Sequence, residues 1–190
     1  MNKVFIVAVH KEVNTQTTIL DYPVIFSGVG KINATIAACK AFSGGYDEVI
    51  NIGSCGSKNH KAGEILKVGQ VFQDIDATPL SQYGLTPFEA ASDQIVLDAM
   101  SPITCFTTDY FYDDDQTNKY SPYYLNMINR CSIFDMECFA LAKVCKRFNI
   151  KFTSYKWVSD DGNASNWENN CKIGFEKVKE LLINADSKII

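Results

Sequence analysis

Two adjacent acids stand at the end of a stretch that has the pattern of a β-strand. Residues 152–158 form a β-branched and aromatic run, and the polar sequence Ser-Asp-Asp-Gly-Asn follows at residues 159–163. This pattern predicts a strand that stops at Asp160 and Asp161. In open α/β sheets ligands bind at the carboxyl ends of the strands, so both acids are candidates for acid–base chemistry. Asp-Asp-Gly-Asn is also typical of an ordinary turn.

Two further acids occupy comparable positions. Residues 4–9 form an apolar run of strand length, and Glu12 follows it. Glu137 follows a short strand expected at residues 132–134 and opens an amphipathic helix. Three acids from distant parts of the chain therefore stand at or just after strand ends. Taken alone, Glu12 is equally typical of a surface acid after a strand.

The elements that must position these acids alternate between strand and helix. Further strands are expected at residues 23–26, 48–52, 66–75 and 103–107, and further helices after residues 27–31 and from about residue 165 to 185. The strand at 48–52 runs into small residues at 53–57, where backbone amides can approach a ligand. This alternation predicts an α/β fold with a central mixed β-sheet flanked by helices, in a single domain over residues 1–190.

Each helix shows an apolar face at helical spacing, which predicts the side that packs on the sheet. In the first helix, four alanines would permit close packing alongside Ile32, Ile36 and Cys39. In the second and third helices the predicted core residues are Cys138, Leu141, Ala142, Cys145 and Phe148, and Cys171, Phe175, Val178 and Leu182.

Composition excludes several classes of protein. The net charge is -4 and the 18 basic residues are scattered, which argues against a nucleic-acid partner. The seven cysteines form no Cys-x-x-Cys, a pattern that favours reduced thiols over disulfides or a zinc site. No apolar run approaches the ~18 residues of a membrane span, and the N-terminus does not resemble a signal peptide. We therefore expect a cytoplasmic protein with no membrane partner.

Three motifs together resemble the nucleoside phosphorylase superfamily and, within it, the 5'-methylthioadenosine/S-adenosylhomocysteine nucleosidase family. They are Gly-Ser-Cys-Gly at residues 53–56, Phe-Thr-Thr-Asp-Tyr-Phe at 106–111 and Phe-Asp-Met-Glu at 134–137. The specific pair is Met136-Glu137 opening a helix and Ser159-Asp160 at the end of the next strand. The resemblance covers nearly the whole chain. It implies a nucleoside-phosphorylase-like fold and a purine nucleoside as the small-molecule substrate.

The resemblance also implies a role for each matching residue. Asp160 would protonate purine N7, and Glu137 would bind the ribose 2'- and 3'-hydroxyls and favour an oxocarbenium-like transition state. Glu12 would activate water as the nucleophile, near a basic residue at Lys156. The remaining residues would contact the substrate: Met136 under the sugar, Phe111 stacked on the base, Tyr112 through its backbone at the base edge, Ser159 orienting Asp160, and Ser54, Cys55 and Gly56 lining the ribose side.

The choice between hydrolysis and phosphorolysis depends on a phosphate site. Phosphorylases of the family carry an Arg two residues before the Gly-Ser turn, where this chain has Asn51, and the chain has only Arg130 and Arg147 in all. We therefore expect an N-ribosyl hydrolase that needs no metal or organic cofactor. The alternatives are a phosphorylase that binds phosphate through Ser54, Lys31 and backbone amides, and a nucleoside-binding protein without turnover.

One departure from the nucleosidase pattern concerns the segment between Glu12 and Ser27. Only 14 residues intervene there, fewer than the strand-rich insert that family members usually have. That insert helps to close the 5' side of the sugar, so the sequence leaves the 5' substituent open. The loop at residues 83–88 matches a region that reaches into the partner's site in dimeric relatives. We expect a homodimer or larger homo-oligomer.

Overall fold

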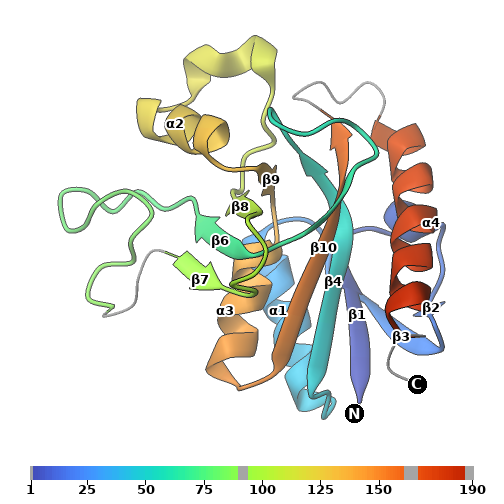
Figure 1. Ribbon diagram of the computed structural model, residues 1–190. Coiled ribbons are helices and arrows are strands. Elements are labelled where there is room, and N and C mark those ends of the chain that lie inside the picture. The colour runs from blue at the N-terminus through green and yellow to red at the C-terminus, as the bar shows by residue number, and fades with distance from the viewer. Residues whose placement is uncertain (1, 90–93, 161–166, 187–190) are drawn as a thin grey trace.

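The computed structural model describes residues 2–89, 94–160 and 167–186, and within that part the chain forms a mixed sheet flanked by helices (Figure 1). The strands are β1 (Lys3–Val7), β2 (Thr18–Ile19), β3 (Tyr22–Phe26), β4 (Glu48–Gly56), β5 (Ile65–Lys67), β6 (Gln70–Gln73), β7 (Gln94–Val96), β8 (Thr104–Thr107), β9 (Ile133–Asp135) and β10 (Lys151–Asp160). The α-helices are α1 (Lys31–Ser43), α2 (Pro122–Arg130), α3 (Cys138–Arg147) and α4 (Trp167–Asp186). Two 3-10 helices are η1 (His10–Val13) and η2 (Asp114–Lys119).

The sheet is mixed: β1, β3, β4 and β10 run parallel, β6, β8 and β9 run parallel, and β9 pairs antiparallel with β4. Its order is β2-β3-β1-β4-β9-β8-β6-β7, and β10 pairs with β4 and β5. Alternate residues of β1 face opposite sides: Val4 and Ile6 pack with α1 and α3, whereas Phe5 and Val7 pack with α4. Figure 1 shows α4 on one side of the sheet and α1 and α3 on the other. The predicted α/β class is confirmed.

Strand β4 is longer than predicted. It continues through the small residues at 53–56, which were expected to leave the strand, because β10 remains its parallel partner from Lys151 opposite Glu48 to Asp160 opposite Gly56. The register shifts between Val158 and Asp160, so the end of β10 is irregular. Such an irregularity re-aims the side chains that follow it.

The predicted inner face of α1 is confirmed for its alanines and wrong for its larger side chains. Ile32 is 77% exposed and Ile36 50%, and Cys39 is also exposed. The buried side is the alanine stripe, Ala34, Ala37, Ala38 and Ala41. Both stripes have helical spacing, and the alanines face inward because α1 packs against both the sheet and α3, where small side chains permit close approach. At the end of α3, Phe148 is also not core: it is 41% exposed and stacks on Phe42, with ring centroids 4.1 Å apart.

The single strand predicted at residues 66–75 is two strands. Strand β5 pairs antiparallel with β10, and β6 pairs parallel with β8. The break falls at Gly69, where a Cβ would lie 2.0 Å from the Ser101 carbonyl oxygen. The chain thus crosses from one partner strand to another at a glycine. The helix α2, the short strands β2 and β7 and both 3-10 helices were not predicted.

Candidate active site

A cavity of about 140 Å³ lies at the carboxyl ends of β4 and β10, closed by the residues that follow β1, β8 and β9. Strands far apart in sequence bring their ends together here, as the parallel arrangement requires. Ten of the eleven site residues predicted from the sequence line it: Glu12, Ser54, Cys55, Gly56, Phe111, Tyr112, Met136, Glu137, Ser159 and Asp160.

Glu12 is held by three hydrogen bonds in η1, directly after β1. Its Oε1 accepts from the Ser54 amide at 2.8 Å and from the Ser54 hydroxyl at 2.7 Å. Its Oε2 accepts from the amide of Val9 at 3.2 Å. The side chain is only 3% exposed, so Glu12 is not the surface acid that its local sequence also allowed.

Asp160 ends β10, which flanks β4 on the side away from β1, and lines the same cavity. The Ser159 hydroxyl lies 2.8 Å from Asp160 Oδ2 and 3.1 Å from the Cys55 carbonyl oxygen, so it can donate to either. The Asp160 carbonyl accepts from the Ser57 amide at 3.1 Å, which anchors the strand end. Asp161, the other candidate acid of the pair, lies outside the described residues.

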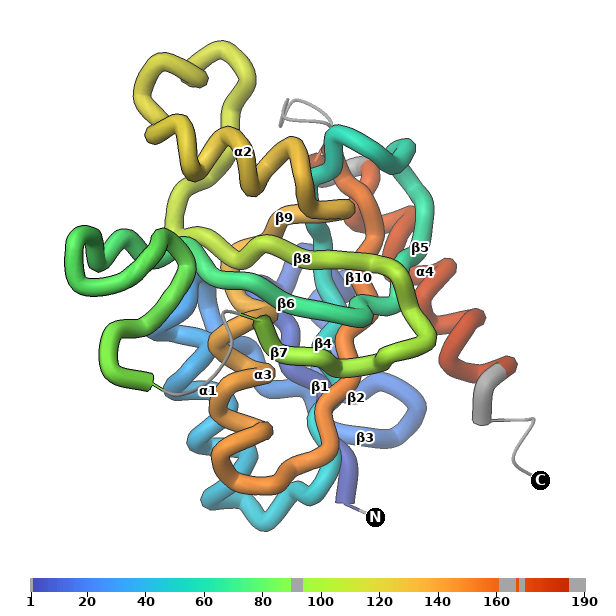
Figure 2. Tube along the Cα trace, turned by 60° about the vertical axis from the view of Figure 1, so that its left-hand side comes forward, coloured from blue at the N-terminus to red at the C-terminus, as the bar shows by residue number. Residues whose placement is uncertain are grey.

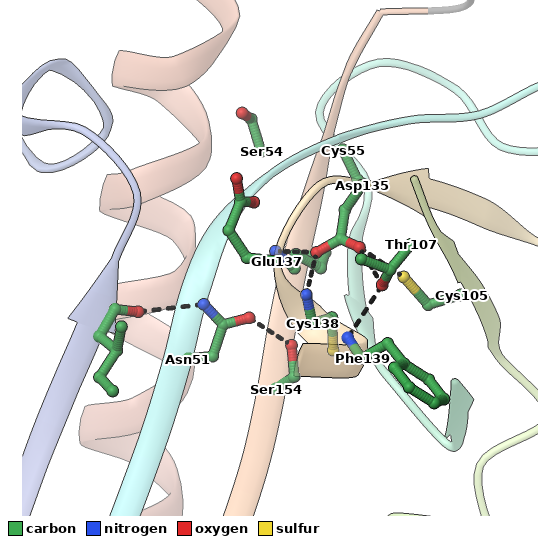
Figure 3. A network of polar contacts seen from close by, with 12 residues as sticks. Asn51, Ser54, Cys55, Cys105, Thr107, Asp135, Glu137, Cys138, Phe139 and Ser154 are labelled. Atoms are coloured by element: carbon green, nitrogen blue, oxygen red, sulfur yellow. Dashed lines mark hydrogen bonds and ion pairs between the residues drawn. The ribbon is translucent and has the colours of Figure 1, made fainter. Parts of the chain in front are cut away.

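Glu137 lines the same cavity from the turn between β9 and α3. Its Oε1 accepts from the Gly30 amide at 2.9 Å, and Figure 3 shows its carboxylate turned toward Ser54. The side chain is 6% exposed. Burial, and then the negative charge of Asp135, raises the pKa of Glu137 to about 8. The site therefore stores unfavourable electrostatic energy when Glu137 is ionised.

We predict that Glu137→Gln stabilises the fold in a pH-dependent way. The folded-state pKa of about 8 exceeds the usual 4.5, so the wild type loses stability as the pH rises from about 4.5 through 8. Glutamine carries no such penalty, and its advantage should grow by about 2–5 kcal/mol across that range. Thermal unfolding of both proteins at pH 5, 6.5 and 8.5 would measure it, with Glu89→Gln as an exposed control. An advantage that does not change with pH would contradict this account.

A buried polar network beneath the cavity centres on Asp135, which sequence reasoning did not single out as a site residue. Asp135 Oδ2 lies 2.7 Å from Lys156 Nζ and accepts from the Cys138 amide at 2.9 Å, and Oδ1 accepts from the Thr107 hydroxyl at 2.6 Å (Figure 3). Burial opposes ionisation of Asp135, but Lys156 holds the pKa of this carboxyl below its usual value. Asp135 therefore fixes the start of α3, and with it Met136 and Glu137.

Lys156, predicted to lie near the attacking water, is buried behind the cavity wall. It is 1% exposed and is not among the residues that line the cavity. Its ammonium lies behind Gly53: a Cβ there would be 3.1 Å from Glu12 Oε1 and 3.6 Å from Lys156 Nζ. The lysine is thus near Glu12 but paired with Asp135.

Cys105, Asp135 and Cys138 have potential metal-ligand atoms within 4.8 Å of one another. Both carboxylate oxygens of Asp135 already accept hydrogen bonds, and the ammonium of Lys156 supplies the neighbouring positive charge. These contacts explain why the three side chains lie together without requiring a metal ion.

The cavity wall formed by the residues after β8 is aromatic. Phe111 is 55% exposed, whereas Tyr112 is buried and donates its hydroxyl to Asp114, which also pairs with Lys58. The Tyr120 hydroxyl donates to the Phe111 carbonyl at 3.0 Å. The acidic run at residues 113–115 therefore includes a contact that ties this wall to the loop after β4.

The sequence predicts no arginine phosphate site, because Asn51 stands where family phosphorylases carry an arginine and the chain has only two arginines. Asn51 is buried in β4, where it donates to the Ile6 carbonyl at 3.0 Å and accepts from the Ser154 hydroxyl at 2.8 Å (Figure 3). Arg130 and Arg147 end α2 and α3. No arginine is among the described residues that line the cavity.

Trp167 is a second residue that sequence reasoning missed. It begins α4, lines the cavity and donates its indole N–H to the Ser54 hydroxyl at 3.1 Å. Nothing in its local sequence distinguished it from a core aromatic.

A family model described as the phosphorylase superfamily matches residues 6–185 of the chain. The chain belongs to the phosphorylase superfamily. This superfamily member is 25% identical to 5'-methylthioadenosine/S-adenosylhomocysteine nucleosidase of Haemophilus influenzae strain PittEE, over 90% of this chain and 79% of that relative. The predicted family is thereby confirmed.

Solved structures of the superfamily show the same fold. Futalosine hydrolase of Helicobacter pylori strain 26695 has a TM-score of 0.78 at 16% identity, covering 96% of this chain and 98% of that chain. The 5'-methylthioadenosine/S-adenosylhomocysteine nucleosidase of Helicobacter pylori, solved with butyl-thio-DADMe-Immucillin-A, has a TM-score of 0.76 at 17% identity, covering 97% and 99%. In the part of this superfamily member that the structure describes, no helix is long and apolar enough to cross a membrane.

Proposed function

We propose that this member of the phosphorylase superfamily is a nucleosidase that hydrolyses the N-glycosidic bond of a purine nucleoside. The observation that carries the proposal is the placement of Glu12, Glu137 and Asp160 around one cavity whose described lining contains no arginine. Acids on opposite sides of a bond provide a general acid and a general base, whereas phosphorolysis requires an anion site. The nucleosidase relative from Haemophilus influenzae supports the same choice.

In the proposed reaction, Asp160 gives a proton to purine N7 while the N-glycosidic bond breaks and its electron pair leaves with the base. Glu137 binds the ribose 2'- and 3'-hydroxyls. In its ionised form, which a pKa of about 8 makes the minor form below that pH, it also offsets the positive charge that develops on the sugar. Glu12 accepts a proton from water as the water oxygen bonds to the anomeric carbon. The products are the free purine and the free sugar, and the reaction needs no metal or organic cofactor.

The remaining residues have supporting roles in this proposal. Phe111 is exposed enough to stack on the base, and Tyr112 presents its backbone to the base edge. The Ser159 hydroxyl orients Asp160. Met136 lies under the sugar, while Ser54, Cys55 and Gly56 line the ribose side. A Cβ at Gly56 would lie 2.0 Å from Phe134 Cε2, so this wall requires glycine. Lys156 pairs with Asp135, and its positive charge lies behind Gly53, near the general base Glu12.

The proposed substrate is an adenine nucleoside with a 5'-thio substituent, 5'-methylthioadenosine or S-adenosylhomocysteine. The names of several relatives support this choice, but a relative with a TM-score of 0.78 is a futalosine hydrolase. The segment after Glu12 contributes only η1 and the short β2–β3 hairpin before Ser27. Rates of purine release from 5'-methylthioadenosine, S-adenosylhomocysteine and futalosine would show which 5' substituent the site prefers.

We predict that hydrolysis is independent of phosphate. In the alternative phosphorylase, Lys31 would bind phosphate, but its Nζ donates to the Asp74 carbonyl at 2.6 Å and lies 3.4 Å from Asp109 Oδ2. The rate of adenine release should stay constant as phosphate is added to phosphate-free buffer, with potassium chloride as the ionic-strength control. A rate that rises from zero and saturates with phosphate would favour the phosphorylase. Tight nucleoside binding with no release under either condition would favour a binding protein.

We also predict a homodimer or larger homo-oligomer that uses the loop at residues 83–88. This loop follows β6 and projects from the molecule in Figures 1 and 2, and its Phe88 is 95% exposed. Tyr83 is half-buried and bonds to Asp74, so Phe88 is the principal exposed apolar side chain of the loop. Phe88→Ser should shift the sedimentation equilibrium toward monomer. Met100→Ser, at a residue 91% exposed on another loop, should not. A fully active wild-type monomer at low concentration would refute the prediction.

A further inference from the structure

Trp167 connects α4 to the proposed general base through one intervening side chain. Its indole Nε1–H donates to Ser54 Oγ at 3.1 Å, and Ser54 Oγ lies 2.7 Å from Glu12 Oε1. The three residues come from α4, β4 and η1, and all three line the cavity. Among the described residues, these two hydrogen bonds join the first residue of α4 to Glu12.

The chemistry of the donors fixes the direction of this chain. An indole N–H can only donate, and a serine hydroxyl has a single proton. With Trp167 donating into the Ser54 oxygen, the serine proton points toward Glu12. Glu12 Oε1 then accepts two hydrogen bonds, from the Ser54 hydroxyl and the Ser54 amide. Oε2 accepts only from the Val9 amide among the described donors, which leaves it able to accept a proton from water.

We propose that Trp167 is a positioning residue for Glu12: its indole N–H orients the Ser54 hydroxyl, which holds Oε1 and directs Oε2 to the nucleophilic water. This inference rests on the proposed function, in which Glu12 is the base. Without the indole N–H, the Ser54 hydroxyl can rotate away and the carboxylate can adopt unproductive orientations. The effect should therefore appear in the rate of reaction rather than in substrate binding.

A double-mutant cycle of Trp167→Phe and Ser54→Ala tests the relay. Phenylalanine keeps an aromatic ring against the cavity but removes the donor. We expect Trp167→Phe to lower kcat by about 3–10-fold, as for the loss of one hydrogen bond, with KM changed by less than about 2-fold. In the Ser54→Ala background, Trp167→Phe should have no further effect. Equal effects in both backgrounds, or an effect on KM alone, would overturn the inference.

A second measurement does not depend on activity. The chain has two tryptophans, so the ¹⁵N-labelled protein gives two indole N–H signals, and Trp167→Phe identifies one of them. We expect the Trp167 indole proton to exchange slowly with solvent in the wild type and faster in Ser54→Ala, while the Trp157 proton keeps its rate. Fast exchange in the wild type would overturn the relay even if hydrolysis is confirmed. If the wild type lacks hydrolase activity but the indole is protected, the hydrogen bond stands and the proposed function fails.

Discussion

Asp160→Asn should lower kcat by about 10²–10⁴-fold, the range typical of a lost general acid. Asparagine keeps the size of the side chain and can still donate a hydrogen bond to purine N7, but it cannot transfer a proton. Binding of the nucleoside should therefore change much less than turnover, and KM should remain within a few-fold of the wild-type value. Steady-state release of adenine, measured with titration calorimetry of substrate binding, would separate the two effects.

The matched control for this substitution is Asp98→Asn. Asp98 pairs with Lys67 at 2.7 Å and is not among the residues that line the cavity, so its loss should leave turnover unchanged. Near-wild-type turnover in Asp160→Asn would contradict the assignment of the acid. The unfolding temperatures of both variants would show whether a loss of turnover results from a destabilised fold.

Glu12→Gln should suppress turnover over a similar range, about 10²–10⁴-fold, but through a different step. Glutamine removes the proton acceptor for water and leaves activation of the departing base intact. A ribosyl substrate whose leaving group departs without protonation distinguishes the two variants. With that substrate Asp160→Asn should recover most of its activity, whereas Glu12→Gln should not.

The control for Glu12→Gln is Glu89→Gln, because Glu89 is exposed and pairs with Lys143 away from the cavity. Equal recovery of the Glu12 and Asp160 variants on the activated substrate would mean that Glu12 does not act on water. The burial of the three acids would then need another explanation, since carboxylates are costly to bury.

The positions of the three acids near strand ends could be predicted because each acid adjoins an element with a clear pattern. An apolar run precedes Glu12, an alternating run precedes Asp160, and an amphipathic helix follows Glu137. The parallel strands β1 and β10, on either side of β4, then bring Glu12 and Asp160 to one edge of the sheet. The residues that line the cavity beside them were predicted through the family resemblance, because glycine and serine after a strand carry little information alone.

Other features depend on tertiary contacts that no local pattern reveals. Asp135 matters because Lys156, on another strand, lies beside it in the interior. Trp167 matters because its N–H meets Ser54. In α1, both the isoleucines and the alanines have helical spacing, and hydrophobicity favours the isoleucines as core. The alanines are buried because a neighbouring helix lies close to them, which only the folded structure determines.

The measurement that tests the central claim most directly is the identity of the sugar product. Purified protein would be incubated with 5'-methylthioadenosine in phosphate-free buffer and again with phosphate present, and the products analysed by mass spectrometry. The account predicts adenine and unphosphorylated 5-methylthioribose in equal amounts under both conditions. A sugar 1-phosphate as the product, formed only when phosphate is present, would contradict it.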